Sequence, residues 1–207
     1  MTLPASASGP AAVRAETYLA EDDGIVRARS VGRSAGAEPV TAATGAALTL
    51  LAAAVSARAV VEIGTGAGVS GLYLLRGMAA DGTLTSIDVD PELQRAARAS
   101  FLAAGAGPSR LRLINGMALE VLPRLTDGGY DLIVADAVPA EYPGYLAEAV
   151  RLLRTGGVLV LDGAVGDGAE GPGAAALRET VDLVREDERL VSALLPVADG
   201  MLCAVRR

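Results

Sequence analysis

Three glycines at alternate positions, Gly64, Gly66 and Gly68, are the part of the sequence with the clearest ligand-binding chemistry. They follow an apolar run that ends at Ile63 and precede a helical pattern that begins at Ser70. A backbone without Cβ atoms can turn tightly and approach a ligand, and the first turn of the next helix presents N–H groups that have no partner within the helix. The spacing predicts a ligand-binding loop, with a loop that only caps the helix as the alternative.

Two acidic residues at the ends of apolar runs narrow the choice of ligand. Asp88, 24 residues after Gly64, can accept hydrogen bonds from both hydroxyls of a ribose. Glu62 can accept from an ammonium group or order the loop, but it would oppose a diphosphate. Val69 occupies the position where a dinucleotide-binding loop has its third glycine. The pattern therefore disfavours NAD, and an NAD-dependent oxidoreductase is kept as an alternative.

Asp136 and Asp162 follow two later apolar runs, in VADAVPAEY and LVLDG. A carboxylate at the carboxyl end of a central strand faces the ligand cleft of an open α/β sheet. The chain has no histidine and one cysteine, which excludes histidine bases, histidine-ligated zinc and cysteine-pair sites within the chain. Asp136 is therefore the candidate for positioning a substrate or taking its proton, with a purely structural role as the alternative.

These residues are positioned by short apolar runs that alternate with helical patterns. We expect helices over Ser70–Ala79, Pro91–Ala104, Ala118–Leu125 and Tyr142–Leu153. Strands are expected over Ala59–Ile63, Leu84–Ile87, Leu111–Ile114, Leu132–Val134 and Val158–Leu161. Consecutive apolar residues in strands that are separated by helices indicate a parallel sheet covered on both faces.

The two ends of the chain differ from this alternation. After a helix at Ala174–Arg185, RLVSALLPV and MLCAVRR are strand-like runs joined around Asp199-Gly200, which predicts an antiparallel hairpin. Residues 16–56 have helical patterns with a break at Ser34–Val40, and residues 1–15 are expected to be flexible. The predicted fold is one α/β domain over residues 16–207. It is a Rossmann-like three-layer sandwich whose mostly parallel seven-stranded sheet ends in the hairpin.

Charge and hydropathy exclude several classes of partner. The net charge of −7, without a basic run or stripe, disfavours a nucleic-acid substrate. The longest nearly apolar stretch, Ala46–Val55, is far shorter than the roughly 20 residues that span a membrane. The first residues have no basic start followed by an apolar run, so no secretory signal is expected and the protein is expected to be cytoplasmic.

Taken in order, five motifs resemble those of the class I methyltransferases that use S-adenosyl-L-methionine (SAM). More narrowly, the chain resembles the bacterial O-methyltransferases related to catechol and caffeoyl-CoA O-methyltransferases, over roughly residues 15–207. The opening PVTAATGAALTLL and the closing LLPVADGMLCAVRR fit that narrower group. The five motifs are VEIGTGAGVSG, IDVDPE, INGMALEVLPRL, YDLIVADA and LLRTGGVLVLD.

The resemblance implies a role in SAM binding for nine residues. Glu62 would lie near the methionine amino group, Ser70 at the carboxylate and Asp88 at the ribose. The backbone of the glycine loop would approach the cofactor, Val40 would lie against its methionine portion, and two residues after Gly116 would line the adenine. Core packing is the alternative for Val40 and for those two. The implied residues are Val40, Glu62, Gly64, Thr65, Gly66, Ser70, Asp88, Met117 and Ala118.

The resemblance also implies a divalent metal site, from which this chain departs. The catechol-type enzymes hold the ion with an Asp after the fourth strand and an Asp-Asn pair after the fifth, and a nearby lysine helps to take the proton. Asp136 and Asp162 match the two acids, but Gly163 stands in place of the Asn and Pro139 in place of the lysine. Two alternatives stay open: Asp136 and Asp162 hold Mg²⁺ weakly, or metal assistance is lost.

The expected function is O-methylation of a small molecule, and the alternatives differ in class. A SAM-binding protein without catalysis would also explain the missing Asn and lysine. Tyr142 and Tyr145 either stack on a substrate or pack under the turn at Pro139–Pro143, and Glu141 is expected to be solvated. The stretch VGDGAEGPGA is either a lid or a linker, and homodimers are usual in the resembled group.

Overall fold

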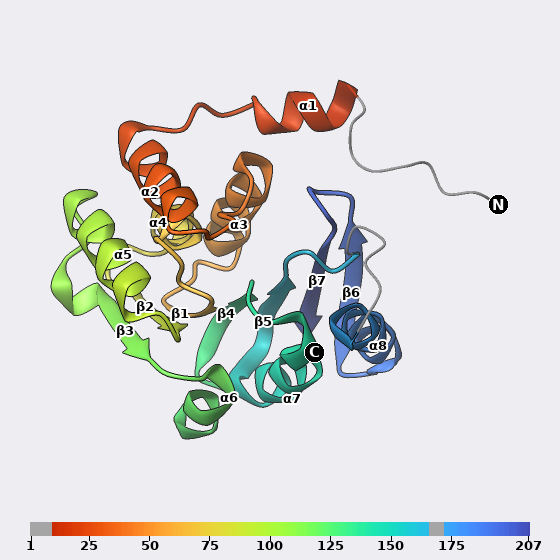
Figure 1. The fold of residues 1–207 in the computed structure, drawn as a ribbon. Helices are drawn as coiled ribbons and strands as arrows, with labels where there is room; N and C mark the ends of the chain where they lie inside the picture. The colour runs from red at the N-terminus through yellow and green to blue at the C-terminus, as the bar shows by residue number, and fades with distance from the viewer. Residues whose placement is uncertain (1–9, 166–171) are drawn as a thin grey trace.

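Seven strands form one sheet in the order β3-β2-β1-β4-β5-β7-β6, and helices cover both of its faces (Figure 1). The structure, a computed structural model, describes residues 10–165 and 172–207. The first five strands run parallel, and β7 pairs antiparallel with both β5 and β6. The predicted Rossmann-like sandwich with a terminal antiparallel pair is confirmed.

The strands and helices lie close to their predicted positions. The strands are β1 Ala59–Ile63, β2 Thr83–Asp88, β3 Leu111–Asn115, β4 Tyr130–Ala135, β5 Leu153–Leu161, β6 Leu190–Leu195 and β7 Met201–Arg206. The α-helices are α1 Pro10–Glu16, α2 Asp23–Ser34, α3 Ala42–Ala54, α4 Val69–Gly77, α5 Pro91–Ala103, α6 Ala118–Val121, α7 Tyr142–Leu152 and α8 Pro172–Glu186. Three 3₁₀ turns complete the described elements, namely η1 Pro108–Arg110, η2 Leu122–Arg124 and η3 Pro139–Glu141.

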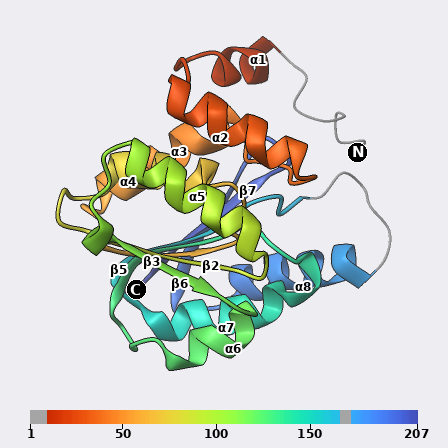
Figure 2. The same cartoon turned by 60° about the vertical axis from the view of Figure 1, so that its left-hand side comes forward.

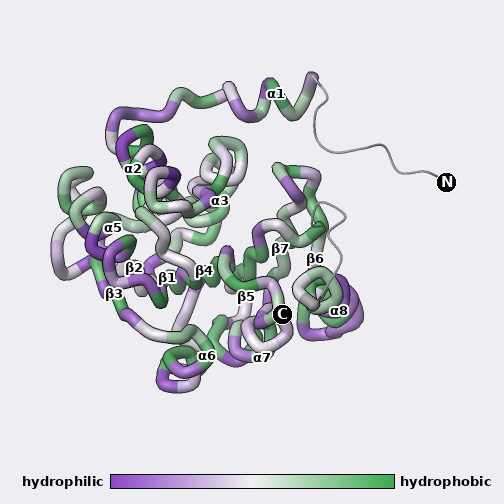
Figure 3. The backbone as a smooth tube through the Cα atoms, viewed as in Figure 1, coloured by the Kyte–Doolittle hydropathy of each residue, from purple (hydrophilic) through white to green (hydrophobic). Residues whose placement is uncertain are grey.

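The sheet divides the hydrophobic core into two layers. Helices α2 to α5 lie on one face and α6 to α8 on the other (Figure 2). The hydrophobic residues concentrate along the central strands, as Figure 3 shows for β1, β4 and β5. Strands whose residues are buried on both faces are the arrangement that continuous apolar runs predict.

Polar side chains fix the start of the helices that surround the ligand-binding edge. Asp22 accepts hydrogen bonds from two N–H groups at the start of α2, Thr41 accepts one at the start of α3, and Asp90 accepts two at the start of α5. Such capping contributes about 1 kcal/mol per helix. Helix α4 differs, because its cap residue is Gly68, which has no side chain to satisfy the first amides.

The structure differs from the expected elements at a few places. The helix predicted over Ala118–Leu125 is a short α6 followed by η2, because Pro123 cannot donate the next backbone hydrogen bond. Strand β5 begins five residues earlier than predicted. Its pairing register with β4 shifts between Tyr130 and Leu132. Helix α1 occupies the last part of the segment expected to be flexible, and residues 1–9 lie outside the described residues, as do positions 166–171 of the proposed lid or linker. Within the described ranges, no helix has the length and apolar character needed to cross a bilayer.

Candidate functional site

A cavity of about 800 Å³ opens at the carboxyl ends of the central parallel strands. Its walls come from the segment between α2 and α3, the glycine loop after β1, the ends of β2 and β3, and the turn after β4. This position is where ligands bind in open α/β sheets, at the point where the strand order reverses. In this sheet the order reverses between β1 and β4. The volume falls within the roughly 300–1,000 Å³ of small-molecule sites.

Gly64 must be a glycine because the chain passes the next strand at very close range. Its φ of 93° is in the region that side chains rarely adopt, and a Cβ atom there would lie 2.0 Å from the carbonyl oxygen of Asp136. Gly66 and Gly68 also have positive φ, of 49° and 92°. The glycine spacing therefore serves two purposes: it turns the backbone tightly, and it lets the loop lie directly against the end of β4.

The start of helix α4 faces the cavity with its first backbone amides. Val69 and Ser70 line the cavity, and Gly68 provides no capping side chain. The Ser70 hydroxyl donates to Glu62 Oε1 at 2.6 Å instead of capping the helix. Uncapped N–H groups at a helix start form a site for an anionic group such as a carboxylate.

Glu62 is buried behind the loop and does not line the cavity. Its carboxylate accepts hydrogen bonds from the hydroxyls of Ser70 and Ser86, and Ser86 in turn lies 2.6 Å from the Thr65 hydroxyl. Burial raises the pKa of Glu62 to about 7, although the two serine hydrogen bonds act in the opposite direction. Glu62 therefore orders the loop from behind, one of the two roles predicted for it. Ser86, in the middle of β2, carried no sequence signal for this contact.

Asp88 joins the loop to the end of β2. Its Oδ2 accepts from the N–H of Gly66 at 2.8 Å, and its Oδ1 accepts from the N–H of Asp90 at 2.8 Å. The side chain lines the cavity next to the loop. This geometry places a carboxylate where a ribose can donate both of its hydroxyls, as the spacing predicts.

Three further predicted residues also line the cavity. Met117 is 50% exposed, so it is not a core residue. Val40 and Ala118 are buried, at 6% and 7% exposure, and each contributes to the wall while packing against the core. For these two, core packing and a position at the cavity are compatible.

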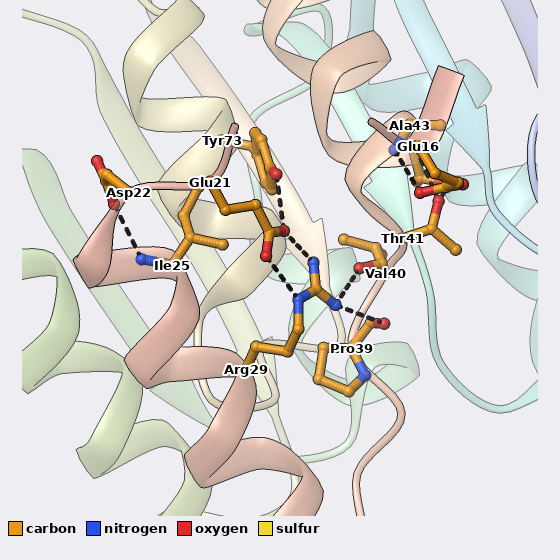
Figure 4. A network of polar contacts seen from close by, with 11 residues as sticks. Glu16, Glu21, Asp22, Ile25, Arg29, Pro39, Val40, Thr41, Ala43 and Tyr73 are labelled. Carbon is orange, nitrogen blue, oxygen red and sulfur yellow. Dashed lines mark hydrogen bonds and ion pairs between the residues drawn. The ribbon is translucent and has the colours of Figure 1, made fainter. Parts of the chain in front are cut away.

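A network of polar contacts holds the wall formed by Pro39 and Val40 (Figure 4). Arg29 of α2 donates to the carbonyl oxygens of Val40, at 2.7 Å, and Pro39, at 3.3 Å. Its guanidinium also makes a two-point ion pair with Glu21, and Glu21 accepts a hydrogen bond from the Tyr73 hydroxyl of α4 at 2.9 Å. Because the Arg29 guanidinium and its hydrogen bond lower it, the pKa of Glu21 lies below its ordinary value. No spacing pattern predicted this network, because Tyr73 is 52 residues from Glu21 in the chain.

Asp136 lines the cavity at the end of β4. Its backbone carbonyl lies close to Gly64 of the glycine loop. Burial raises its pKa to about 6. Burial also raises the pKa of Asp162 to about 7, and the charge of Asp136 adds to that effect. The two carboxylates therefore lie close enough to repel each other, at the ends of neighbouring strands.

The expected divalent metal does not fit this arrangement. Asp162 does not line the cavity that Asp136 faces, and one of its oxygens is buried without a hydrogen-bond partner in the described ranges. Gly163 has no side chain to add a ligand, and the structure, where it describes the chain, brings together no group of three acidic, histidine or cysteine ligands. An ion that also binds a substrate would need ligands that face the same space.

The aromatic residues after β4 have different roles. Tyr142 is buried, and its hydroxyl donates to the carbonyl oxygens of Ala135 and Asp162, so it packs beneath the turn. Tyr145 is also buried, but it contributes to the cavity wall and donates to Glu141 Oε2 at 2.6 Å. Glu141 is half-buried and lines the cavity.

Comparisons of the sequence and of the structure with known proteins both find O-methyltransferases. A sequence profile of the O-methyltransferase family matches residues 23–207. A Mycobacterium tuberculosis protein named "Probable O-methyltransferase" is 53% identical over 198 residues, which cover 93% of this chain and 88% of that protein. A Corynebacterium glutamicum crystal structure has a TM-score of 0.87 at 32% identity, with 94% of each chain covered. An O-methyltransferase of Streptomyces achromogenes involved in tomaymycin synthesis, crystallised with SAM, has a TM-score of 0.85 at 25% identity, with 95% of each chain covered.

Proposed function

Because this chain belongs to the O-methyltransferase family, we propose that it transfers the methyl group of SAM to a hydroxyl group of a small molecule. The observation that carries the proposal is the cavity in which the glycine loop, the open start of α4 and the Asp88 carboxylate face one space. The bound SAM of the Streptomyces achromogenes relative supports the choice of donor.

We propose a role in SAM binding for each of the residues that the resemblance implies. Asp88 would accept from the ribose hydroxyls, and Met117 and Ala118 would flank the adenine. Ser70 and the first amides of α4 would hold the methionine carboxylate, and Val40 would lie against the methionine portion. Gly64, Thr65 and Gly66 would contact the donor through their backbone, with Glu62 keeping the loop in place.

Bound SAM supplies a methyl group on a positively charged sulfur, which a hydroxyl oxygen can displace in line. The carbon–sulfur bond breaks, the carbon–oxygen bond forms, and the hydroxyl loses its proton. The protein then has to align the two reactants about 3 Å apart and exclude water. Asp136, at the end of the strand next to the loop, would position the acceptor hydroxyl, and either Asp136 or solvent would take the proton.

Calorimetric titration with SAM and with NADH tests the donor assignment. We expect SAM to bind with a dissociation constant in the micromolar range, about −8 kcal/mol, and NADH to bind far more weakly, because Val69 and Glu62 suit no diphosphate. Binding of NADH in preference to SAM would overturn the proposal. SAM binding without methyl transfer across a broad acceptor screen would favour the second candidate, a SAM-binding protein without catalysis, which the missing Asn and lysine support.

Methyl transfer is expected to proceed without a divalent ion. Since Asp162 does not line the cavity and Gly163 offers no ligand, Asp136 is the single carboxylate of the implied pair that lines the cavity. Initial rates measured with excess EDTA and with added Mg²⁺ should agree within about twofold. Lewis-acid assistance lowers the barrier by several kcal/mol, so its loss would reduce the rate by far more than twofold. A rate that collapses in EDTA and returns with Mg²⁺ would show that the two aspartates do hold an ion.

The oligomeric state and the cellular location stay predictions. The edge strand β6 exposes Val191, Leu194 and Leu195, and an apolar sheet edge of this kind is a surface that a second copy can cover. We propose a homodimer, which light scattering of the purified protein would distinguish from a monomer. A cytoplasmic location rests on the sequence alone, and fractionation of the source cells would test it.

A further inference from the structure

The charged side chains that line the cavity all have the same sign. Within the parts of the chain that the structure describes, they are Glu38, Asp88, Asp136 and Glu141, and no arginine joins them. The chain contains no lysine, and residues 1–9 and 166–171, which the structure does not describe, contain no basic side chain either. The other lining residues are mostly apolar. No cation of the protein lines the cavity, so the negative potential of these carboxylates is not neutralised there.

Arg29, which contacts the cavity wall at Pro39 and Val40, is already neutralised by its ion pair with Glu21. The Nη1 group of Arg29 donates to the carbonyl oxygens of Pro39 and Val40, and its Nε and Nη2 groups donate to the two carboxylate oxygens of Glu21. Neither Glu38 nor Glu141 forms an ion pair with a cation in the described ranges. Their charges are therefore free to act on a ligand.

The sheet order separates Asp88 from Asp136 and Glu141. Asp88 belongs to β2, beside the glycine loop, and is taken up by the ribose and the loop. Asp136 and Glu141 follow β4, and Glu38 lies in the segment between α2 and α3. Glu141 is held in place by the Tyr145 hydroxyl, so its second oxygen can face a ligand without the cost of ordering the side chain.

We propose that this cavity selects its acceptor by charge and takes a hydroxyl compound that carries a protonated amine, held by Glu141 and Glu38. This inference rests on the proposed function and names the class of its acceptor. A cation gains attraction from up to three carboxylates, whereas an anion of the same shape is repelled by all three and finds no basic partner. A coenzyme A thioester, which carries several phosphate charges, is therefore not the acceptor.

Three ligands of matched shape test this selection. They are 4-hydroxybenzylamine, 4-hydroxybenzyl alcohol and 4-hydroxybenzoate, which share the ring and the phenol and differ by one charge from each to the next. Each is titrated into the full chain loaded with S-adenosylhomocysteine, followed by ligand-observed NMR, with coenzyme A as a fourth probe. We expect the amine to bind at least about tenfold more tightly than the benzoate, the alcohol to fall between them, and coenzyme A not to compete. The preference should shrink as salt rises.

Variants link the preference to the two glutamates. The double variant Glu38→Gln with Glu141→Gln should reduce the amine-to-benzoate ratio to below about threefold, because the amides keep the shape and lose the charge. The control Glu120→Gln removes one charge from an exposed residue outside the cavity and should leave the ratio unchanged.

The outcomes separate this inference from the proposed function. Failure of S-adenosylhomocysteine and SAM to bind would sink the proposed function itself. If S-adenosylhomocysteine binds but the three ligands bind equally, bind in the reverse order or do not bind at all, the charge selection is overturned while the methyltransferase assignment stands. An unchanged ratio in the double variant would likewise overturn the role of Glu38 and Glu141.

Discussion

Asp88→Ala is expected to weaken SAM binding by at least about 100-fold, since two charge-assisted hydrogen bonds to a ribose are worth roughly 1.5–3 kcal/mol each. The substitution also removes the acceptor of the Gly66 N–H, so the glycine loop loses the contact that holds it beside β2. Titration calorimetry of the purified variant measures the change directly. Unchanged affinity would contradict the assignment of Asp88 to the donor.

Asp90→Ala is the matched control for this experiment. Asp90 lies two residues further along and caps helix α5 through the N–H groups of Glu92 and Leu93, but it does not line the cavity. Its loss should cost about 1 kcal/mol of unfolding free energy, measured by denaturant titration, and leave SAM affinity unchanged. A comparable loss of affinity in both variants would indicate that loop stability, rather than ribose recognition, is being measured.

Asp136→Asn is expected to lower the methyl-transfer rate by about 100-fold or more while SAM still binds, because a positioned base typically contributes 10²–10⁴-fold. Burial raises the pKa of Asp136 to about 6, and only the ionised form can accept a proton. In the unsubstituted protein, kcat/KM should therefore rise as pH increases through about 6 and level off above it. Rates measured from pH 5 to 8 on both proteins test the assignment.

Asp162→Asn separates the role of Asp136 from that of its neighbour. Asp162 follows the adjacent strand but does not line the cavity, so this variant should retain turnover. Equal losses in the two variants would point to a shared site and argue for a metal. A full rate in Asp136→Asn would assign the proton to solvent.

Much of the fold and of the donor end could be predicted because the signals are local. The buried strands appear as continuous apolar runs, and the glycine spacing marks a loop whose close approach to β4 the structure confirms. Asp88 and Asp136 were predicted at the cavity because the carboxyl ends of parallel strands meet at one edge.

The contacts that could not be predicted join residues from distant parts of the chain. Arg29 and Tyr73 meet at Glu21 only after α2 has docked beside α4, and no spacing in the sequence indicates that contact. The hydrogen bond from the Tyr145 hydroxyl to Glu141, which was expected to be solvated, had no signal in the sequence either. The metal site was implied by the resemblance, through two acids that follow neighbouring strands, and a position after a strand does not tell whether Asp162 lines the cavity.

The strand order also bears on how the domain assembles. In the described structure, β6 pairs with β7 and not with β5, although it precedes β7 in the chain. Leu190–Leu195 is therefore connected to the rest of the sheet only through Met201–Arg206, which pairs with Val158–Leu161. A polypeptide that stops short of Met201 would leave β6 without a strand partner and one edge of β5 unpaired, so the sheet can be completed only after synthesis has passed that point.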